Sequence, residues 1–159
     1  MFKAFWKDAG YHVAIKVFDM AQIPQDAIES VLIEVNLLGN LSHPNIIRIL
    51  GYHRNSGNLY LMLEYAEEGS LLSKIKDKKG LPENTVLCYI VQVLKALKYL
   101  HANNVIHRDL KAANILLTKK GEVKLGDFGV AAVMDDRDKH YTVVGSPYWS
   151  KYQFIIQYS

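Results

Sequence analysis

Residues 105–129 read VIHRDLKAANILLTKKGEVKLGDFG, and this segment is the most informative part of the chain about its fold. Four polar side chains fall here among apolar residues typical of short strands and turns: Asp109, Lys111, Asn114 and Asp127. Polar and charged groups in such a setting must be hydrogen-bonded, paired or bound to an ion. The pattern therefore favours a site that performs catalysis and binds a metal ion together with phosphate groups.

Two motifs in this segment carry a resemblance to a known family. His-Arg-Asp-Leu-Lys begins at His107, and Asn114 follows five residues after Asp109. Asp-Phe-Gly then occupies residues 127–129. In this order and spacing the motifs resemble those of eukaryotic-type serine/threonine protein kinases, over about residues 1–149. The resemblance implies an α+β, two-lobe kinase fold that transfers the γ-phosphoryl group of ATP to a Ser/Thr hydroxyl of a protein.

The resemblance also gives each polar side chain a role. Asp109 would accept the proton of the substrate hydroxyl, and Lys111 would neutralise charge on the transferred phosphoryl group. Asn114 and Asp127 would hold Mg²⁺, a hard cation that prefers oxygen ligands. A lysine at position 111 resembles serine/threonine kinases rather than tyrosine kinases. His107 would be a packing residue that links the two loops.

Residues 12–18, HVAIKVF, predict a strand that is apolar on both faces apart from Lys16. Residues 13–16 resemble the kinase motif whose lysine holds the α- and β-phosphates of ATP. The alternative is an edge-strand lysine whose stem reaches solvent. Residues 1–4 predict the end of a preceding strand, and residues 8–10 predict the hairpin turn between the two strands.

Residues 24–41 predict a helix with Glu34 at the edge of its apolar stripe. The resemblance implies that Glu34 forms an ion pair with Lys16 and so orients this lysine towards the phosphates. An exposed glutamate on the helix flank is the alternative. Two strands are predicted at residues 46–52 and 59–65, joined by a polar turn.

The end of the second of these strands resembles the hinge of kinases. Backbone groups near Glu64 and Ala66 would pair with adenine, and Leu63 would line the back of the pocket. Ala14 and Leu116 complete the ATP-binding set that the resemblance implies.

Two helices are predicted next, a short one over residues 70–77 and a long one over residues 83–103. The long helix has a wide apolar stripe, which indicates burial against more than one neighbour. In kinases, further helices cover this region. Because the chain stops before them, we expect an exposed apolar patch that favours association.

Residues 130–146 resemble a kinase activation segment. Thr142 occupies a position that is often phosphorylated in related kinases, which implies an upstream activating kinase as a partner, and Arg108 would bind the phosphate. The sequence GSPYW that follows resembles the substrate-facing loop of the Ste20 and MAP-kinase-kinase-kinase branches, with Ser146 where the family usually has threonine.

The chain departs from the kinase pattern at both ends. The Gly-rich loop and the first strand of the family are expected before Met1. The family pattern ends after Trp149, and our hypothesis is a truncated gene model or splice product that diverges there. We therefore expect residues 1–66 to form a partial small lobe with the hinge, residues 67–149 the first half of the large lobe, and residues 150–159 a divergent tail. A catalytically inactive kinase-like interaction fragment is the alternative function, and a small-molecule phosphotransferase is a weaker one.

The composition is that of an ordinary globular protein, with 159 residues, 50% hydrophobic residues and a net charge of +3. The single cysteine, Cys88, excludes an internal disulfide and indicates a reducing compartment, so we expect a cytoplasmic location and a packed thiol. No apolar run predicts a membrane span. The lysine cluster at residues 74–79 predicts a solvated loop rather than a nucleic-acid site, because no aromatic residues interleave with it.

Overall fold

The computed structural model describes residues 1–22, 28–127 and 132–133 of the chain. The chain divides into two compact units. Unit 1 contains Met1–Ser42 and Ile47–Tyr65, and unit 2 contains His43–Ile46 and the described residues from Ala66 onwards. Unit 2 is therefore discontinuous in sequence, because its first four residues interrupt unit 1.

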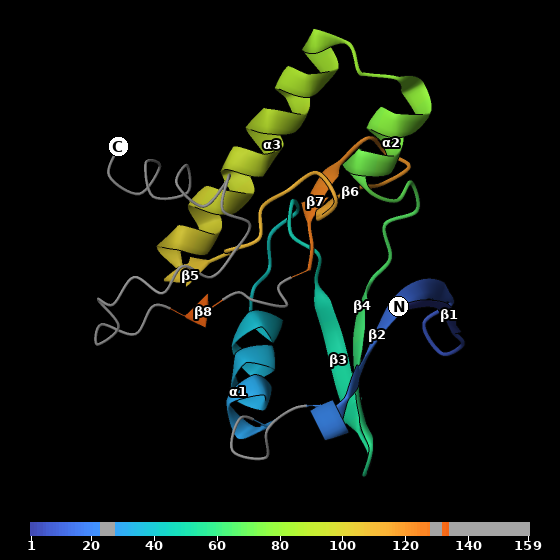
Figure 1. Ribbon diagram of the computed structural model, residues 1–159, viewed down its shortest axis with the longest axis vertical. Coiled ribbons are helices and arrows are strands. Elements are labelled where there is room, and N and C mark those ends of the chain that lie inside the picture. Colours follow the sequence, from blue (N-terminus) through green and yellow to red (C-terminus); the bar gives the residue numbers. More distant parts are fainter. Residues whose placement is uncertain (23–27, 128–131, 134–159) are drawn as a thin grey trace. The chain divides into compact units, whose positions relative to one another are not determined.

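Unit 1 is built on a four-stranded antiparallel sheet (Figure 1). Its order is β1-β2-β4-β3, with β1 at Phe2–Trp6, β2 at Tyr11–Asp19, β4 at Asn58–Glu64 and β3 at Ile49–Arg54. The β1–β2 hairpin closes where the N–H of Gly10 donates to the carbonyl of Trp6 at 2.9 Å. Gly10 has a φ of +74°, which a residue with a Cβ adopts only at a cost.

One helix packs against this sheet through a small apolar core. Helix α1, Ile28–Gly39, buries Val35 against Leu59 and Leu61 of β4. The short 3-10 turn at Met20–Gln22 adds Met20 to the same cluster. Residues 24–27, where the sequence predicts the start of this helix, lie outside the described part of the chain.

The predicted strand at residues 46–52 begins too early, since β3 starts only at Ile49. Ile46 instead forms an isolated parallel bridge with Leu125, in unit 2. Ile46 and Ile47 are buried and apolar, a pattern typical of a strand, but the backbone of Ile46 pairs with Leu125 rather than with β4. The predicted turn is confirmed: Asn55 Oδ1 accepts from the N–H of Asn58 at 2.7 Å.

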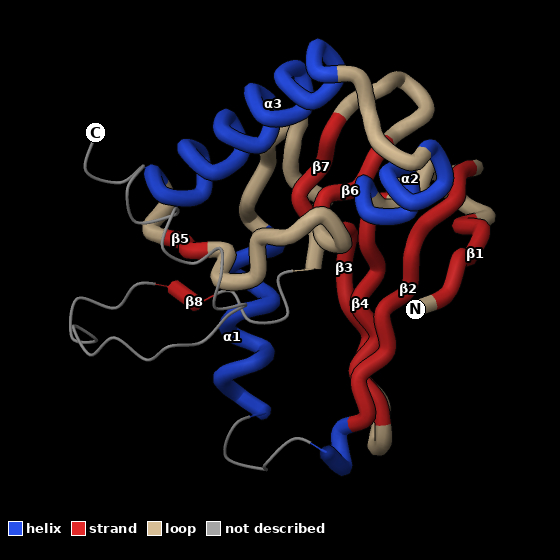
Figure 2. Tube along the Cα trace, turned by 45° about the horizontal axis from the view of Figure 1, so that its top comes forward, coloured by secondary structure: helices blue, strands red, loops and turns tan. Residues whose placement is uncertain are grey.

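Unit 2 combines two helices with short two-stranded ladders (Figure 2). The long helix α3 packs against β5 and β7, and α2 packs against β6. The strand pairs β6–β7 and β5–β8 are both antiparallel. The bounds are α2 Leu71–Lys78, α3 Glu83–Ala102, β5 Val105–Ile106, β6 Ile115–Leu117, β7 Val123–Leu125 and β8 Ala132–Val133.

Local capping defines α2. The Oγ of Ser70 accepts from the N–H of Ser73 at 3.2 Å, and Lys79 ends the helix in the left-handed region with a φ of 53°. The lysines of residues 74–79 therefore lie mostly on a helix, and their assignment to a loop was wrong. Lys74 is paired with Glu68 at 2.8 Å.

Helix α3 is buried in its C-terminal half and exposed in its N-terminal half. Leu97 and Leu100 are buried, whereas five apolar residues are exposed: Val86, Leu87, Ile90, Val91 and Leu94. An apolar groove of about 280 Å³ lies between this half of α3 and α2. The expected exposed patch is thus present in the described structure. The predicted burial of Cys88 was wrong, because its position on the helix faces solvent.

The antiparallel sheet with one helix, followed by a unit with two helices, confirms the predicted α+β class. No helix in the described ranges has both the length and the apolar character needed to cross a bilayer.

Candidate active site

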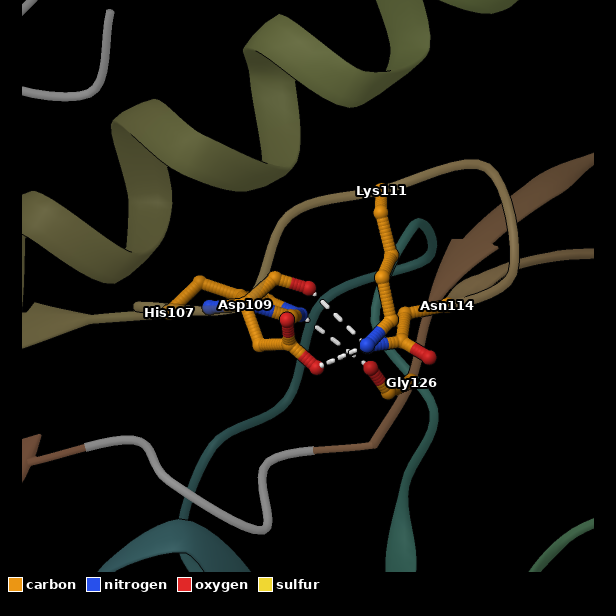
Figure 3. Close-up of polar contacts among 5 residues, drawn as sticks. All are labelled: His107, Asp109, Lys111, Asn114 and Gly126. Carbon is orange, nitrogen blue, oxygen red and sulfur yellow. Dashed lines mark hydrogen bonds and ion pairs between the residues drawn. The ribbon is translucent and has the colours of Figure 1, made fainter. Parts of the chain in front are cut away.

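Asp109 is the centre of the polar cluster in unit 2 (Figure 3). Its Oδ2 receives two donors, the Nζ of Lys111 at 2.7 Å and the Nδ2 of Asn114 at 2.8 Å. The Asp109 side chain is 16% exposed and the Lys111 side chain 40%, so the cluster opens towards solvent on the lysine side. Charge-assisted bonds of this kind hold a carboxylate in one orientation.

Asn114 is held by the backbone on both sides of its side chain. Its N–H donates to the carbonyl of Lys111 at 2.9 Å, and its own carbonyl accepts from the N–H of Gly126 at 2.9 Å. The Nδ2 group makes a second bond, to the carbonyl of Asp109 at 2.9 Å. Because both donors of the amide serve Asp109, its oxygen lies on the side away from that residue (Figure 3).

His107 links the loop of Asp109 to the segment before Asp127. It is fully buried, and its Nε2 lies 3.1 Å from the carbonyl of Gly126. Since a carbonyl only accepts, Nε2 carries the proton, and Nδ1 accepts from the N–H of Asp109 at 3.4 Å. Burial lowers the pKa of His107. The predicted packing role of this residue is therefore accompanied by hydrogen bonds to both loops.

Backbone strain marks the two ends of the cluster. Arg108 and Asp127 have φ values of 61° and 60°, in the left-handed region that favours glycine. Such a conformation costs about 1–2 kcal/mol for a residue with a side chain, and it persists where the surroundings fix it. The bonds of His107 and Asn114 to Gly126 supply that constraint next to Asp127.

The residues present are suited to a hard metal ion that is also bound by phosphate oxygens. In residues 1–22, 28–127 and 132–133, no three His, Cys, Asp or Glu side chains cluster as a metal site. Mg²⁺ is commonly bound by one or two protein oxygens together with substrate phosphates. The amide oxygen of Asn114 and the carboxylate of Asp127 are donors of that class. The chemistry of the donor set therefore fits.

In unit 1, several predicted ATP-site residues lie on adjacent strands. Ala14 on β2 is directly opposite Leu63 on β4, and Lys16 is opposite Leu61. The Lys16 side chain is half-buried, with its Nζ 5.1 Å from the ring centroid of Phe18. This places Ala14 and Leu63 side by side, as a shared adenine wall requires.

Two hinge residues are placed as follows. The N–H of Glu64 donates to the carbonyl of Arg48 at 2.9 Å, so this donor is already used within the sheet. Ala66 is the first residue of the second segment of unit 2. Leu116 lies in that unit on β6, opposite Lys124.

Some predicted site residues lie outside the part of the chain that the structure describes. Glu34 lies on α1, but its side chain is outside what the structure describes, so the Lys16–Glu34 ion pair stays a prediction. Thr142 and Ser146 lie outside the described residues, as do the segment 134–146 and the tail at 150–159.

Sequence reasoning missed a pair of amides beside β7. Asn45 is buried, and its Nδ2 donates to the Oε1 of Gln92 at 3.0 Å and to the carbonyl of Val123 at 2.8 Å. The available signal was an amide among apolar positions, since a buried polar group needs partners. Gln92 sits within the apolar stripe of α3, and Asn45 precedes two isoleucines.

Comparison with known proteins assigns the chain to a family. The model of the protein kinase domain matches residues 1–156 of the chain. The chain belongs to the protein kinase domain family. The match extends beyond Trp149, where the resemblance in sequence was placed to end. The kinase fold expected from the motifs is thus confirmed, and members of this family use ATP with a divalent metal ion and act on proteins.

The kinase domain is similar to serine/threonine kinases from several eukaryotes. It is 46% identical over 150 residues to a probable serine/threonine-protein kinase of Dictyostelium discoideum, covering 94% of this chain and 24% of that protein. It is 45% identical over 152 residues to MAP3K epsilon protein kinase 1 of Arabidopsis thaliana, and the match covers 94% of this chain and 11% of that protein. It is 46% identical over 140 residues to cell division control protein 7 of Schizosaccharomyces pombe, and the match covers 88% of this chain and 13% of that protein. The chain thus spans about a quarter or less of these relatives.

Proposed function

We propose that this kinase domain transfers the γ-phosphoryl group of ATP to a serine or threonine hydroxyl of a protein. The observation that carries the proposal is the arrangement at Asp109, whose carboxylate is held by the Lys111 ammonium and the Asn114 amide. Phosphoryl transfer depends mainly on positioning and on electrostatic stabilisation, and this cluster supplies both.

Asp109 aligns the attacking hydroxyl and accepts its proton. Its Oδ2 accepts from both donors, which fixes the orientation of the carboxylate that is proposed to meet the substrate. Lys111 is the more exposed partner, and its ammonium neutralises charge on the phosphoryl group in transfer. The two residues thereby divide proton acceptance and charge neutralisation between them.

The ATP-binding residues predicted from the kinase motifs are proposed to contact the nucleotide. Lys16, oriented by Glu34, contacts the α- and β-phosphates, while Ala14 and Leu63 contact adenine. The adenine set is completed by Glu64, Ala66 and Leu116. Residues 1–66 then act as the small lobe with its hinge, and residues 67–149 as the first half of the large lobe.

Asn114 and Asp127 are proposed to hold Mg²⁺. A bound ion would supply positive charge that offsets the negative charge of the phosphate groups. The protein contributes a fixed amide oxygen on Asn114 and a carboxylate on Asp127, whose backbone is constrained through Gly126. Asn114 precedes β6 and Asp127 follows β7, so both residues lie at the same end of this antiparallel ladder and a change in the ladder affects them together.

The protein substrate is proposed to be another kinase in a cascade. Lys111 favours Ser/Thr substrates, and one relative is named a MAP3K kinase. Thr142 is proposed to receive an activating phosphate from an upstream kinase, with Arg108 as its partner and Ser146 in the substrate-facing loop. The single cysteine favours a reducing compartment, which for a kinase of this type is the cytoplasm.

A second candidate is a kinase-like interaction fragment without activity of its own. The exposed apolar residues of α3 favour it, because apolar patches of this kind mark association surfaces. The two candidates have the same fold and differ in whether this chain catalyses phosphoryl transfer.

A phosphotransfer assay on the full 159-residue chain separates the candidates. Asp109→Asn should lower the rate by about 10²–10⁴-fold, as expected for loss of a general base. The control is Asp77→Asn on the exposed side of α2, which makes the same chemical change and should leave the rate unaltered. Wild-type protein without Asp109-dependent transfer, but stabilised by magnesium-ATP in a thermal-shift titration, would favour the interaction fragment instead.

A further inference from the structure

The outer edge of β7 is paired by residues from distant parts of unit 2. One edge of β7 pairs with β6. In an antiparallel ladder alternate residues direct their N–H and C=O groups to opposite sides, and here Val123 and Leu125 direct theirs away from β6. The acceptors for their N–H groups are Gln92 on α3 and Asn45 in the segment before β3.

Gln92 occupies the centre of this edge. Its Oε1 accepts from the N–H of Val123 at 2.8 Å and from the Nδ2 of Asn45 at 3.0 Å. Its Nε2 donates to the carbonyl of Cys88 at 3.3 Å, one turn earlier on the same helix, which turns the oxygen towards β7. One amide oxygen thus joins α3, β7 and the segment His43–Ile46.

The same segment holds the next two residues of β7. The N–H of Leu125 donates to the carbonyl of Asn45 at 2.8 Å, and the Nζ of Lys124 donates to the carbonyl of Pro44 at 2.9 Å. Val123 and Leu125 are both fully buried, so an N–H group left without an acceptor there would have no water to replace it.

This edge leads directly to the predicted metal ligand. Leu125 is followed by Gly126, whose N–H donates to Asn114 and whose carbonyl accepts from His107. Asp127 follows in its strained left-handed conformation. Displacement of β7 along its axis would therefore shift Gly126 against Asn114 and move the Asp127 carboxylate.

We infer that Gln92 is a positioning residue for the metal ligand Asp127. It acts through β7, by fixing the edge of the strand that ends two residues before Asp127. The inference rests on the proposed function for the role of Asp127. Its geometric part, that Gln92 fixes Gly126, is independent of that function.

The test uses the full chain, Mn²⁺ with ADP as the probe, and three variants. Gln92→Met keeps the length of the side chain but has no amide, and Gln92→Glu keeps an oxygen that accepts both bonds. Lys98→Leu, at an exposed position of the same helix, is the matched control for adding an apolar side chain to α3. Mn²⁺ binding is read by electron paramagnetic resonance, and ADP binding without metal by calorimetry.

We expect Gln92→Met to weaken Mn²⁺ binding by about tenfold, in line with the loss of outer-sphere support for metal ligands. Metal-free ADP binding should not change. Gln92→Glu should stay within about twofold of wild type, because the acceptor is retained. Equal Mn²⁺ affinity in Gln92→Met and wild type, or equal losses in Gln92→Met and Gln92→Glu, would overturn the inference.

Hydrogen–deuterium exchange at residues 123–127 tests the geometric part separately. Faster exchange of Gly126 in Gln92→Met than in Lys98→Leu supports it, and unchanged exchange rejects it. If Gln92→Met does not fold, Gln92→Ala is measured instead, since it leaves room for a water at Val123. Wild-type protein that binds no Mn²⁺ with ADP rejects the proposed function, whereas the exchange at Gly126 still decides whether Gln92 positions β7.

Discussion

The Nδ2 of Asn114 donates to both the backbone carbonyl and the Oδ2 of Asp109, at 2.9 and 2.8 Å. A side chain proposed to bind metal therefore also fixes the side chain proposed to accept the proton. The two roles are coupled through one amide, whose nitrogen donates to Asp109, while its oxygen has no hydrogen-bond donor within the described part of the chain. Replacing that amide should affect both the loop and the metal.

Asn114→Ala should destabilise the chain by about 1–3 kcal/mol, because the partly buried Asp109 oxygens lose two donors. Urea denaturation measures the change. Asn103→Ala is the control, since the Asn103 amide also donates to a carbonyl, that of Tyr99, but at an exposed helix end. If both variants lost the same free energy of unfolding, the contact with Asp109 would stabilise the chain no more than an exposed helix-end hydrogen bond does.

Stability should fall as the pH drops below about 6.5, the ordinary pKa of histidine. Burial lowers the pKa of His107 in the folded chain, so the unfolded chain binds a proton first and is favoured by acid. His107→Gln keeps a donor for Gly126 but does not titrate. Its urea midpoint should change less than that of wild type between about pH 7.5 and about pH 5.5. His43 and His101, whose pKa values burial also lowers, keep part of the slope.

Lys16→Met and Glu34→Gln should each weaken magnesium-ATP binding, and their effects should not add. A coupling of about 1 kcal/mol is expected if the two side chains form one ion pair. Thermal-shift titrations of both single variants and the double variant give this value. Lys3→Met, on the outer strand β1, combined with Glu34→Gln provides the additive control. Additivity in the Lys16 cycle would rule out the predicted pair.

Thr142→Ala should abolish activation by an upstream kinase while leaving the basal phosphotransfer rate unchanged. Arg108→Gln should still be phosphorylated but gain little activity, because the phosphate loses its guanidinium partner. Phosphotransfer is measured before and after treatment with the activating kinase. Ser146→Ala is the comparison at the other hydroxyl of this segment. Full activation of Thr142→Ala would remove the proposed role.

The exposed face of α3 should make the chain associate as its concentration rises. The double variant Leu87→Glu with Val91→Lys replaces two exposed apolar residues, and the new pair at i and i+4 supports the helix. Light scattering should show less association than in wild type. Lys98→Glu, at an exposed polar position, should behave like wild type. Undiminished association in the double variant would assign it to another surface.

Local pattern predicted the elements whose own residues determine them. The period of the apolar residues gave α3 nearly to its ends, and Ser70 marked the start of α2. Asp109 and Asn114 were identifiable because polar residues in an apolar segment need a chemical reason, and the structure brings the two into contact.

The errors share a physical cause, because local sequence does not determine which distant residues a position contacts. Ile46 looked like part of a strand, but its backbone pairs with Leu125. In sequence, Gln92 is one polar residue within the apolar stripe of a helix. Its structural role follows from its hydrogen bonds with Asn45 and Val123. Cys88 was assigned to the core because helix periodicity does not say which neighbours are present.

The four residues His43–Ile46 have a practical consequence for dissecting the molecule. Cleavage of the chain between Tyr65 and Ala66 would not yield two self-sufficient halves. The C-terminal piece would lack the Asn45 carbonyl that accepts from the Leu125 amide and the Pro44 carbonyl that accepts from the Lys124 ammonium, and Gln92 would lose its contact with Asn45. A separately added peptide that carries Pro44 and Asn45 should restore that piece, so the large-lobe half is best studied by fragment complementation.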